Sequence, residues 1–141
     1  MRTALDTNIL SALWSNEPIA PSIAHLLQEA YAHGAVVICA PVYAELLAHP
    51  SAPPSFIDTF IAETAVSVDW DLGEEVWRRA GNSFASYARR RRISQGGSPR
   101  RMLVDFLVAA HALLRADQFM TLDTNWYKAD FPNLRMVSPH R

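Results

Sequence analysis

The sequence predicts an α/β sandwich with a mainly parallel central sheet. Short runs of apolar and β-branched residues alternate with longer segments of helical periodicity along the 141 residues. Alternation of this kind requires crossover connections, which place successive strands parallel to one another. The length fits a single domain spanning residues 1–141, and 50% of the residues are hydrophobic, which is enough for one substantial core.

The first part of the chain predicts two strands, each followed by a helix. An apolar strand at Thr3–Asp6 leads into a short helix at Thr7–Trp14. The segment Pro21–His33 repeats apolar residues at helical spacing and stops before a glycine. Val36–Cys39 has the composition of a buried strand, and Pro41 begins a helix that ends at Leu47, because proline is favoured in the first helical turn.

The second part continues the alternation. Asp71 and Glu74 have the spacing of a capping box at the start of a long helix that we expect to end at Arg92. Ser98-Pro99 predicts the start of another helix, which continues through Asp105 to Leu114. The other predicted elements are a helix at Phe56–Ala62 and strands at Ala65–Val68, Gln118–Leu122 and Leu134–Val137, the last at an edge of the sheet.

Composition indicates a cytoplasmic protein. The chain has one cysteine, Cys39, so it can form no internal disulfide, and a reducing compartment is the natural interpretation. No signal peptide is recognisable at the start, and the longest apolar run, Ala35–Ala44, is too short to span a bilayer. We therefore expect no membrane partner.

Four acidic residues are predicted to share one edge of the sheet. Asp6 ends the first strand and Asp123 follows the strand Gln118–Leu122, while Glu45 and Asp105 each lie in the second turn of a predicted helix. In a parallel α/β sheet, these positions face the carboxyl ends of the strands, where ligands bind. Converging carboxylates repel one another unless a cation neutralises them, and oxygen ligands suit Mg²⁺ or Mn²⁺ better than zinc.

Each acid also has a purely structural interpretation. Asp6 has the residue type of a helix cap, Glu45 fits a half-buried helix face, and Asp123 fits an ordinary turn. Asp105 is different because it lies inside the apolar run Met102–Ala110, where an acid has to be paired, bound to a ligand or at the helix edge. The shared placement of the acids, more than any one of them, indicates a metal site.

The four acids lie in four short motifs. These are Asp-Thr-Asn after the first strand, an acid in the helix after the second strand, Asp before an Ala-rich helix, and Thr-x-Asp before an aromatic residue. In this sequence the segments are Ala4–Leu10, Pro41–Leu46, Asp105–Ala112 and Thr121–Tyr127. Together they resemble, in order and over essentially the whole chain, the motifs of the PIN-domain family, in particular the toxins of bacterial VapBC toxin–antitoxin pairs.

The resemblance implies a PIN-like three-layer α/β/α sandwich and an endoribonuclease that uses Mg²⁺ or Mn²⁺. Metal-activated water would attack phosphorus in line. The resemblance also implies a homodimer and a small cognate antitoxin that blocks the site. The implied catalytic and metal-binding residues, directly or through water, are Asp6, Glu45, Asp105 and Asp123. Thr7, Asn8 and Thr121 would orient these carboxylates or water without binding the metal themselves.

An arginine-rich stretch gives a second candidate binding feature on a chain of net charge −1. Arginine holds phosphate in a bidentate manner, so these residues suit RNA binding, with Arg100 and Arg101 favoured because they precede Asp105. The alternative is a solvated helix end, stabilised by the helix dipole. The candidate RNA-binding residues are Arg89, Arg92, Arg100 and Arg101.

Two other functions remain open from the sequence. A haloacid-dehalogenase-like phosphatase also uses Mg²⁺ and an Asp after its first strand. It needs a second Asp two residues later, where this chain has Asn8, and a later lysine, for which only Lys128 is available. The other alternative is a catalytically degenerate PIN scaffold that binds RNA or a protein partner.

Overall fold

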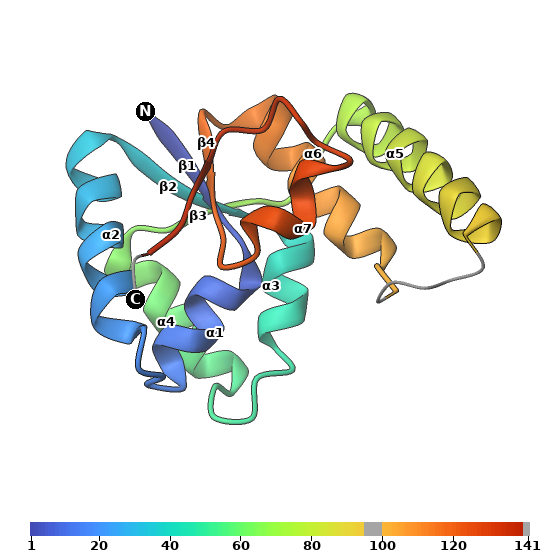
Figure 1. Ribbon diagram of the computed structural model, residues 1–141. Coiled ribbons are helices and arrows are strands. Elements are labelled where there is room, and N and C mark those ends of the chain that lie inside the picture. The colour runs from blue at the N-terminus through green and yellow to red at the C-terminus, as the bar shows by residue number, and fades with distance from the viewer. Residues whose placement is uncertain (95–99, 140–141) are drawn as a thin grey trace.

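Five parallel strands form one sheet in the computed structural model, which describes residues 1–94 and 100–139 (Figure 1). The strands are β1 (Arg2–Leu5), β2 (Ala35–Cys39), β3 (Ser67–Asp69), β4 (Gln118–Met120) and β5 (Met136–Val137). Every neighbouring pair is parallel, so the predicted sheet type is confirmed. The strands start and end within a few residues of their predicted bounds.

The strand order β3-β2-β1-β4-β5 places β1 at the centre of the sheet. The chain runs outward from β1 through β2 to β3, then returns to the other side of β1 for β4 and β5. Ala4 is therefore in register with Val37 on one side and with Phe119 on the other. This reversal makes the edge between β1 and β4 the switch point, where ligands bind in open α/β sheets.

Helices cover both faces of the sheet, which confirms the three-layer sandwich. Figure 1 shows α1, α2 and α4 on one side of the sheet and α5 and α6 on the other. The helix α2 packs against β1 and β2, α6 packs against β1 and β4, and α5 packs on α6. The helices are α1 (Thr7–Trp14), α2 (Ala20–His33), α3 (Ala40–Leu46), α4 (Pro54–Thr64), α5 (Glu74–Ile93), α6 (Leu103–Arg115) and α7 (Thr124–Lys128).

The predicted capping box at Asp71 is wrong. The helix α5 begins at Glu74, its N-cap is Gly73, and Asp71 accepts the backbone N–H of Gly73 at 3.0 Å. Gly73 has a φ of +81°, a conformation that glycine adopts without a side-chain clash. The chain therefore turns at Gly73, and the helix starts after this turn.

The start of α6 also differs from its prediction. The predicted start at Ser98-Pro99 lies outside the described residues, and residues 100–102 are not helical. The helix begins at Leu103, and Asp105 accepts the backbone N–H of Met102 at 3.0 Å. Asp105 therefore lies in the first turn of its helix and not in the second. The short helix α7 was not predicted.

The core lies on both faces of the sheet. Ile9 and Ile23 fill it on the side of α1 and α2, and Phe106 and Phe119 belong to its α6 and β4 parts. Cys39 is buried in the core, and this burial raises the pKa of its thiol to about 12, so it stays protonated and unreactive. None of the helices in residues 1–94 and 100–139 is long and apolar enough to cross a membrane.

A buried polar network joins α6 to the sheet. His111, which is 1% exposed, donates from Nε2 to Asp69 at 2.7 Å, and Arg2 donates to the same carboxylate oxygen. Burial acts to raise the pKa of Asp69, but the hydrogen bonds from His111 and Arg2 lower it overall. Burial lowers the pKa of His111 and outweighs the opposite effect of Asp69. His111 is therefore neutral in the folded protein.

Acid should destabilise the protein through His111. The unfolded chain binds a proton at this residue near its ordinary pKa of 6.5 and the folded protein does so only at lower pH, so stability falls as pH drops through this range. His111→Gln keeps a donor toward Asp69 and carries no charge. Between about pH 7.5 and 5.5 we expect wild type to lose stability relative to this variant in urea unfolding. Equal losses would contradict the burial of a neutral imidazole.

Candidate metal-binding edge of the sheet

Asp6 lies at the switch point, where β1 ends and α1 begins. Its backbone N–H donates to the carbonyl of Met120 in β4 at 2.9 Å. Its Oδ1 accepts the backbone N–H of Thr7 at 2.8 Å, and its Oδ2 accepts the hydroxyls of Thr121 at 2.7 Å and Tyr127 at 3.1 Å. Asp6 is both the predicted helix cap and a carboxylate held at the carboxyl ends of two neighbouring strands.

The environment of Asp6 favours its neutral form. The residue is 7% exposed, and burial raises its pKa to about 6. Hydrogen bonds from Thr121, Tyr127 and Thr7 lower the pKa, while the negative charge of Asp123 raises it further. A buried carboxylate beside a second acid is stabilised by a nearby cation, since the cation offsets both burial and repulsion.

The two residues after Asp6 hold two of the other acids. Thr7 donates its hydroxyl to Glu45 on α3 at 2.6 Å. Asn8 donates its amide to Asp123 at 3.0 Å and accepts the backbone N–H of Leu122 at 3.2 Å. Residues Asp6–Asn8, at the start of α1, thereby bring together acids from the end of β1, from α3 and from the loop after β4.

Asp105 approaches the same region from α6. The residue is half-buried. The pKa of Tyr127 is raised well above its usual range, first by the burial of Tyr127, then by the negative charge of Asp6 and then by that of Asp105. Because Tyr127 donates to Asp6, Asp105 acts on the same cluster. Its carboxylate also accepts the backbone N–H of Met102 and so caps the first turn of α6. Part of the role of Asp105 is therefore to stabilise the start of this helix.

The four acids share an edge, but they do not surround one point. Among the described residues, no three Asp, Glu, His or Cys side chains lie close enough to hold one metal ion. The contacts of Asp6, Glu45 and Asp123 are all with hydroxyl, amide and backbone N–H donors. Carboxylate oxygens are the kind of ligand that Mg²⁺ and Mn²⁺ prefer, so the chemistry of these side chains fits either ion.

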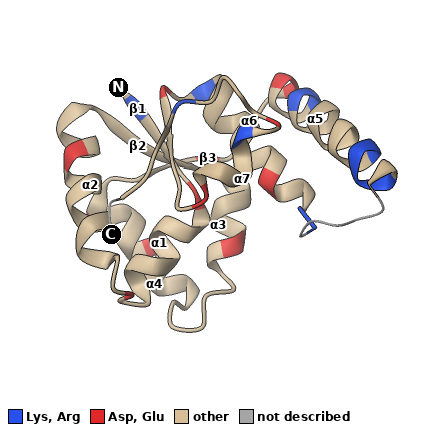
Figure 2. Ribbon diagram, in the orientation of Figure 1, with Lys and Arg blue, Asp and Glu red and all other residues tan. Residues whose placement is uncertain are grey.

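Arg101 differs from its predicted role. It is 7% exposed, and its guanidinium donates to Asp130 at 2.6 Å, so it is not an exposed phosphate-binding side chain. Its guanidinium also lies over the rings of Trp126 and Tyr127, at 4.9 and 5.4 Å from their centroids. Arg89, Arg92 and Arg100 are exposed, and Figure 2 shows basic positions concentrated at the end of α5. These three residues remain candidates for RNA binding.

The sequence left two residues of this region without a role. Tyr127 donates its hydroxyl to Asp6. The only feature of the sequence that pointed to Tyr127 is that it is an aromatic residue close to Asp123. Asp130 forms ion pairs with Arg90 and Arg101, and its side chain is 3% exposed. It lies 29 residues from Arg101 in the sequence, and no local pattern marks such a pair.

The fold and this edge define an α/β protein with several carboxylates along the switch-point edge of a parallel sheet. The chain belongs to the PIN domain family, whose model matches residues 3–132. Because the chain belongs to this family, the haloacid-dehalogenase-like phosphatase alternative is excluded. A comparison with curated proteins found no match.

Two solved structures share the fold. The structure of VapBC2 from Rickettsia felis bound to a DNA fragment from its promoter is 22% identical, covers 99% of this chain and 100% of its own, and has a TM-score of 0.69. The structure of VapBC-1 from nontypeable Haemophilus influenzae is 24% identical, covers 98% of each chain and has a TM-score of 0.66. Both matches extend over nearly the whole length of this chain.

Proposed function

We propose that the protein is an endoribonuclease dependent on Mg²⁺ or Mn²⁺ and the toxin of a type II toxin–antitoxin pair. PIN domains are generally nucleases, and two of the solved structures that share this fold are VapBC complexes. One observation carries the proposal. The consecutive residues Asp6, Thr7 and Asn8 place one buried carboxylate and bind two others, Glu45 and Asp123, at the switch point of the sheet.

Each residue has a role in this proposal. Asp6, Glu45, Asp105 and Asp123 would hold the cation directly or through water, and the bound cation would supply an activated water and stabilise charge on the phosphate. Thr121 and Tyr127 orient the Asp6 carboxylate through its Oδ2, and Thr7 and Asn8 orient Glu45 and Asp123. Glu45 and Asp123 are exposed, so an RNA backbone can reach this edge.

RNA cleavage by the purified protein, freed of any antitoxin, tests the activity. The substrates are a panel of structured RNAs with Mg²⁺ or Mn²⁺, and the controls are EDTA and Asp105→Asn. Asp71→Asn is a matched control, because Asp71 is exposed and accepts only a local backbone N–H in the structure. We expect cleavage at discrete sites by wild type and by Asp71→Asn, and none with EDTA or by Asp105→Asn.

A different outcome would favour a catalytically degenerate scaffold. If wild type and Asp105→Asn are equally inactive on every RNA and bind RNA alike, the carboxylates are not catalytic. The same experiment therefore separates an enzyme from a protein that only binds RNA or a partner.

The proposed partner is a small cognate antitoxin, and the protein is proposed to form a homodimer. Co-expression with its antitoxin should suppress RNA cleavage and yield a stable complex in size-exclusion chromatography. Light scattering on the separated protein measures its oligomeric state. A monomer, or a complex that cleaves RNA at the full rate, would contradict the corresponding part of the proposal.

Asn8→Ala should reduce cleavage without unfolding the protein. The variant loses the donor to Asp123 and the acceptor for Leu122, so the loop after β4 is less well positioned. Loss of a residue that orients a metal ligand typically costs about 10- to 100-fold in activity or metal affinity. Initial rates against Mn²⁺ concentration measure the effect, with Asn125→Ala, an exposed position on α7, as control. Unchanged rates for Asn8→Ala would show that Asp123 needs no such support.

A further inference from the structure

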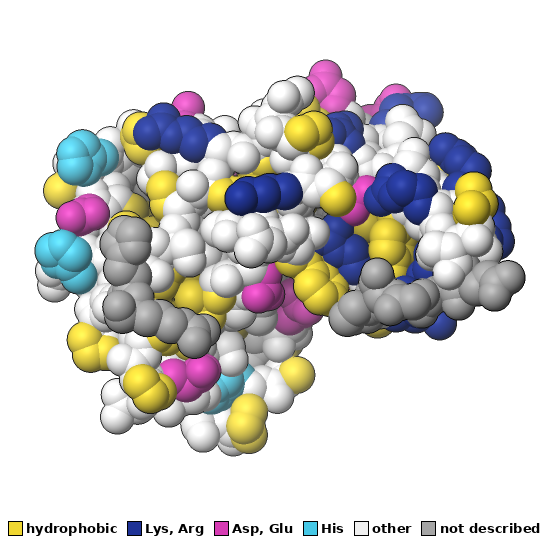
Figure 3. Space-filling model, in the orientation of Figure 1, with side chains coloured by type: hydrophobic (Ala, Val, Ile, Leu, Met, Phe, Trp, Pro, Cys, Tyr) yellow, Lys and Arg dark blue, Asp and Glu magenta, His cyan; other side chains and the backbone are white. Residues whose placement is uncertain are grey.

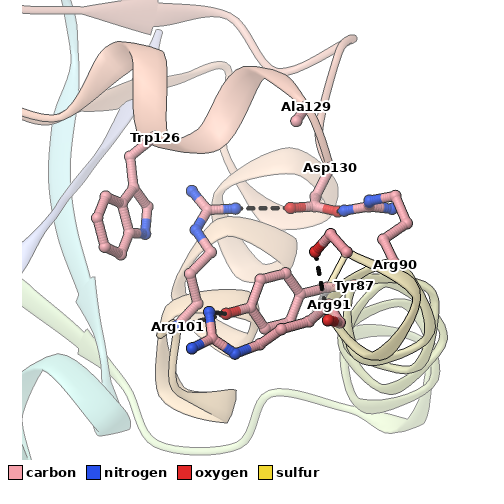
Figure 4. A pocket seen from close by; sticks show the side chains of 8 residues that line it. Tyr87, Arg90, Arg91, Arg101, Trp126, Ala129 and Asp130 are labelled. Carbon is pink, nitrogen blue, oxygen red and sulfur yellow. Dashed lines mark hydrogen bonds and ion pairs between the residues drawn. The ribbon is translucent and has the colours of Figure 1, made fainter. Parts of the chain in front are cut away.

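A cavity of about 320 Å³ lies beside α7, between the end of α5 and Arg101 (Figure 4). Its walls include Tyr87, Arg90, Arg91, Arg101, Trp126 and Asp130. Figure 4 shows the arginine side chains and the ring of Trp126 around the same space. The size is at the lower end of the range found for small-ligand sites, about 300 to 1,000 Å³.

The charges of this cavity favour an anion. Asp130 is the one acid among the described residues of its wall, and it pairs with both Arg90 and Arg101. These two guanidinium groups against one carboxylate leave an excess of positive charge. Arg90 is 53% exposed, so part of this charge is accessible from solvent.

Arg101 has an unused donor in the same wall. Its Nη1 is bound to Asp130, but its buried Nη2 has no hydrogen-bond partner, one of two such side-chain nitrogens among residues 1–94 and 100–139. A buried guanidinium donor without a partner costs free energy, because it has lost water and gained nothing in exchange. Because this nitrogen is buried, a ligand in the cavity does not contact it, and Arg101 contributes positive charge to the wall rather than a hydrogen bond.

The remaining wall is aromatic and connects the cavity to the carboxylate edge. Trp126 is 36% exposed, and the next residue, Tyr127, donates to Asp6 at 3.1 Å. The guanidinium of Arg101 lies over both rings. Figure 3 shows Lys and Arg side chains around hydrophobic ones on the α5 side of the molecule. A chain of phosphates that reaches Asp6 would have this basic and aromatic surface directly beside it.

We infer that this cavity is a subsite for one nucleotide of single-stranded RNA, with its phosphate at Arg90 and its base against Trp126. An arginine cluster alone would fit any phosphate, but an aromatic ring beside it fits the unpaired base of a single strand. The inference rests on the proposed function, since it takes the RNA to be the substrate that is cut at the neighbouring carboxylates.

RNA binding measured without catalysis tests this subsite. The probe is a short fluorescein-labelled single-stranded RNA of mixed sequence, titrated with protein in EDTA at several salt concentrations. Stacking of one base is worth about 1 to 3 kcal/mol, so Trp126→Ala should raise Kd by about ten-fold. Trp126→Phe keeps a ring and should retain most of the affinity. Trp77→Ala, which removes a tryptophan 54% exposed on α5 and outside the cavity wall, should bind like wild type.

Arg90→Gln tests the phosphate contact. It should weaken binding and lower the slope of log Kd against log salt concentration by about 0.7, the value for one phosphate contact with a single strand. Arg78→Gln removes the same charge from the same helix at an exposed pair with Glu74, so its slope should match wild type. An RNA series with one abasic position moved along the strand identifies the stacked base. In Trp126→Ala that abasic position should cost nothing further.

The outcomes separate this subsite from the proposed nuclease. If wild type cleaves RNA but Trp126→Ala and Arg90→Gln bind it like their controls, the subsite is wrong and the nuclease stands. The subsite is wrong in that case even if the same variants bind the antitoxin less well. If wild type cleaves no RNA but its binding depends on Trp126 and Arg90, the subsite stands and the nuclease does not. Wild type that binds no single-stranded RNA overturns the subsite.

Discussion

Asp6→Asn should abolish RNA cleavage and, without divalent cations, stabilise the protein at neutral pH by about 1 to 3 kcal/mol. Burial and the charge of Asp123 raise the pKa of Asp6 to about 6, from an ordinary value of 3.8. At neutral pH the folded protein therefore carries a carboxylate that it holds less favourably than the unfolded chain does. A ten-fold change in an ionisation constant corresponds to about 1.4 kcal/mol, which sets the upper end of the range.

The sign of the pH dependence follows from the same shift. Between about pH 4 and 6 the folded protein keeps a proton on Asp6 that the unfolded chain has released. This contribution to stability is therefore present at low pH and is lost as pH rises through the folded pKa of about 6. Asparagine does not titrate, so the difference in stability between Asp6→Asn and wild type should grow over this range and then level off.

Urea unfolding in EDTA and in Mg²⁺ measures the effect. In EDTA the variant should be more stable than wild type. Added Mg²⁺ or Mn²⁺ should stabilise wild type only, because the proposed site binds the cation through the Asp6 carboxylate. Asp71→Asn should match wild type in both conditions. A variant less stable than wild type at about pH 7 in EDTA would show that the hydrogen bonds of Asp6 outweigh its burial.

Asp130→Ala should destabilise the protein by about 3 to 5 kcal/mol. The side chain of Asp130 is 3% exposed and that of Arg101 is 7% exposed, so removal of the carboxylate leaves a buried guanidinium without its counterion. Arg90, on α5, loses the same partner. The loss should affect the packing of α5 and α7 around Arg101.

Two further variants serve as controls for the effect of Asp130→Ala. Glu75→Gln breaks the ion pair with Arg115, in which Glu75 is 76% exposed, and it should cost well under 1 kcal/mol because exposed ion pairs contribute little. Arg101→Met combined with Asp130→Ala should recover much of the stability, since apolar groups often replace a buried ion pair at little cost. A loss for Asp130→Ala no larger than that for Glu75→Gln would contradict the network.

The sequence predicted the placement of Asp6 and Asp123 better than that of Asp105. Asp6 and Asp123 follow strands, and the ends of parallel strands are set by short apolar runs that are visible locally. Asp105 depends on where α6 begins, and that start follows a non-helical segment at residues 100–102 in which the backbone N–H of Arg101 donates to the hydroxyl of Tyr87. A helix start of this kind depends on tertiary contacts, so the local pattern placed it too early.

The sequence by itself determined the parallel α/β class, the chain order of the acidic residues and the edge of the sheet at which they lie. These properties follow from hydrophobic periodicity and from strand ends, which are local. Only the tertiary structure decided that Tyr127 donates to Asp6 and that Asp130 pairs with Arg101, over separations of 121 and 29 residues. It also decided the pKa of Asp6, because that value depends on burial by side chains from the whole chain and not on the neighbours of Asp6 in the sequence.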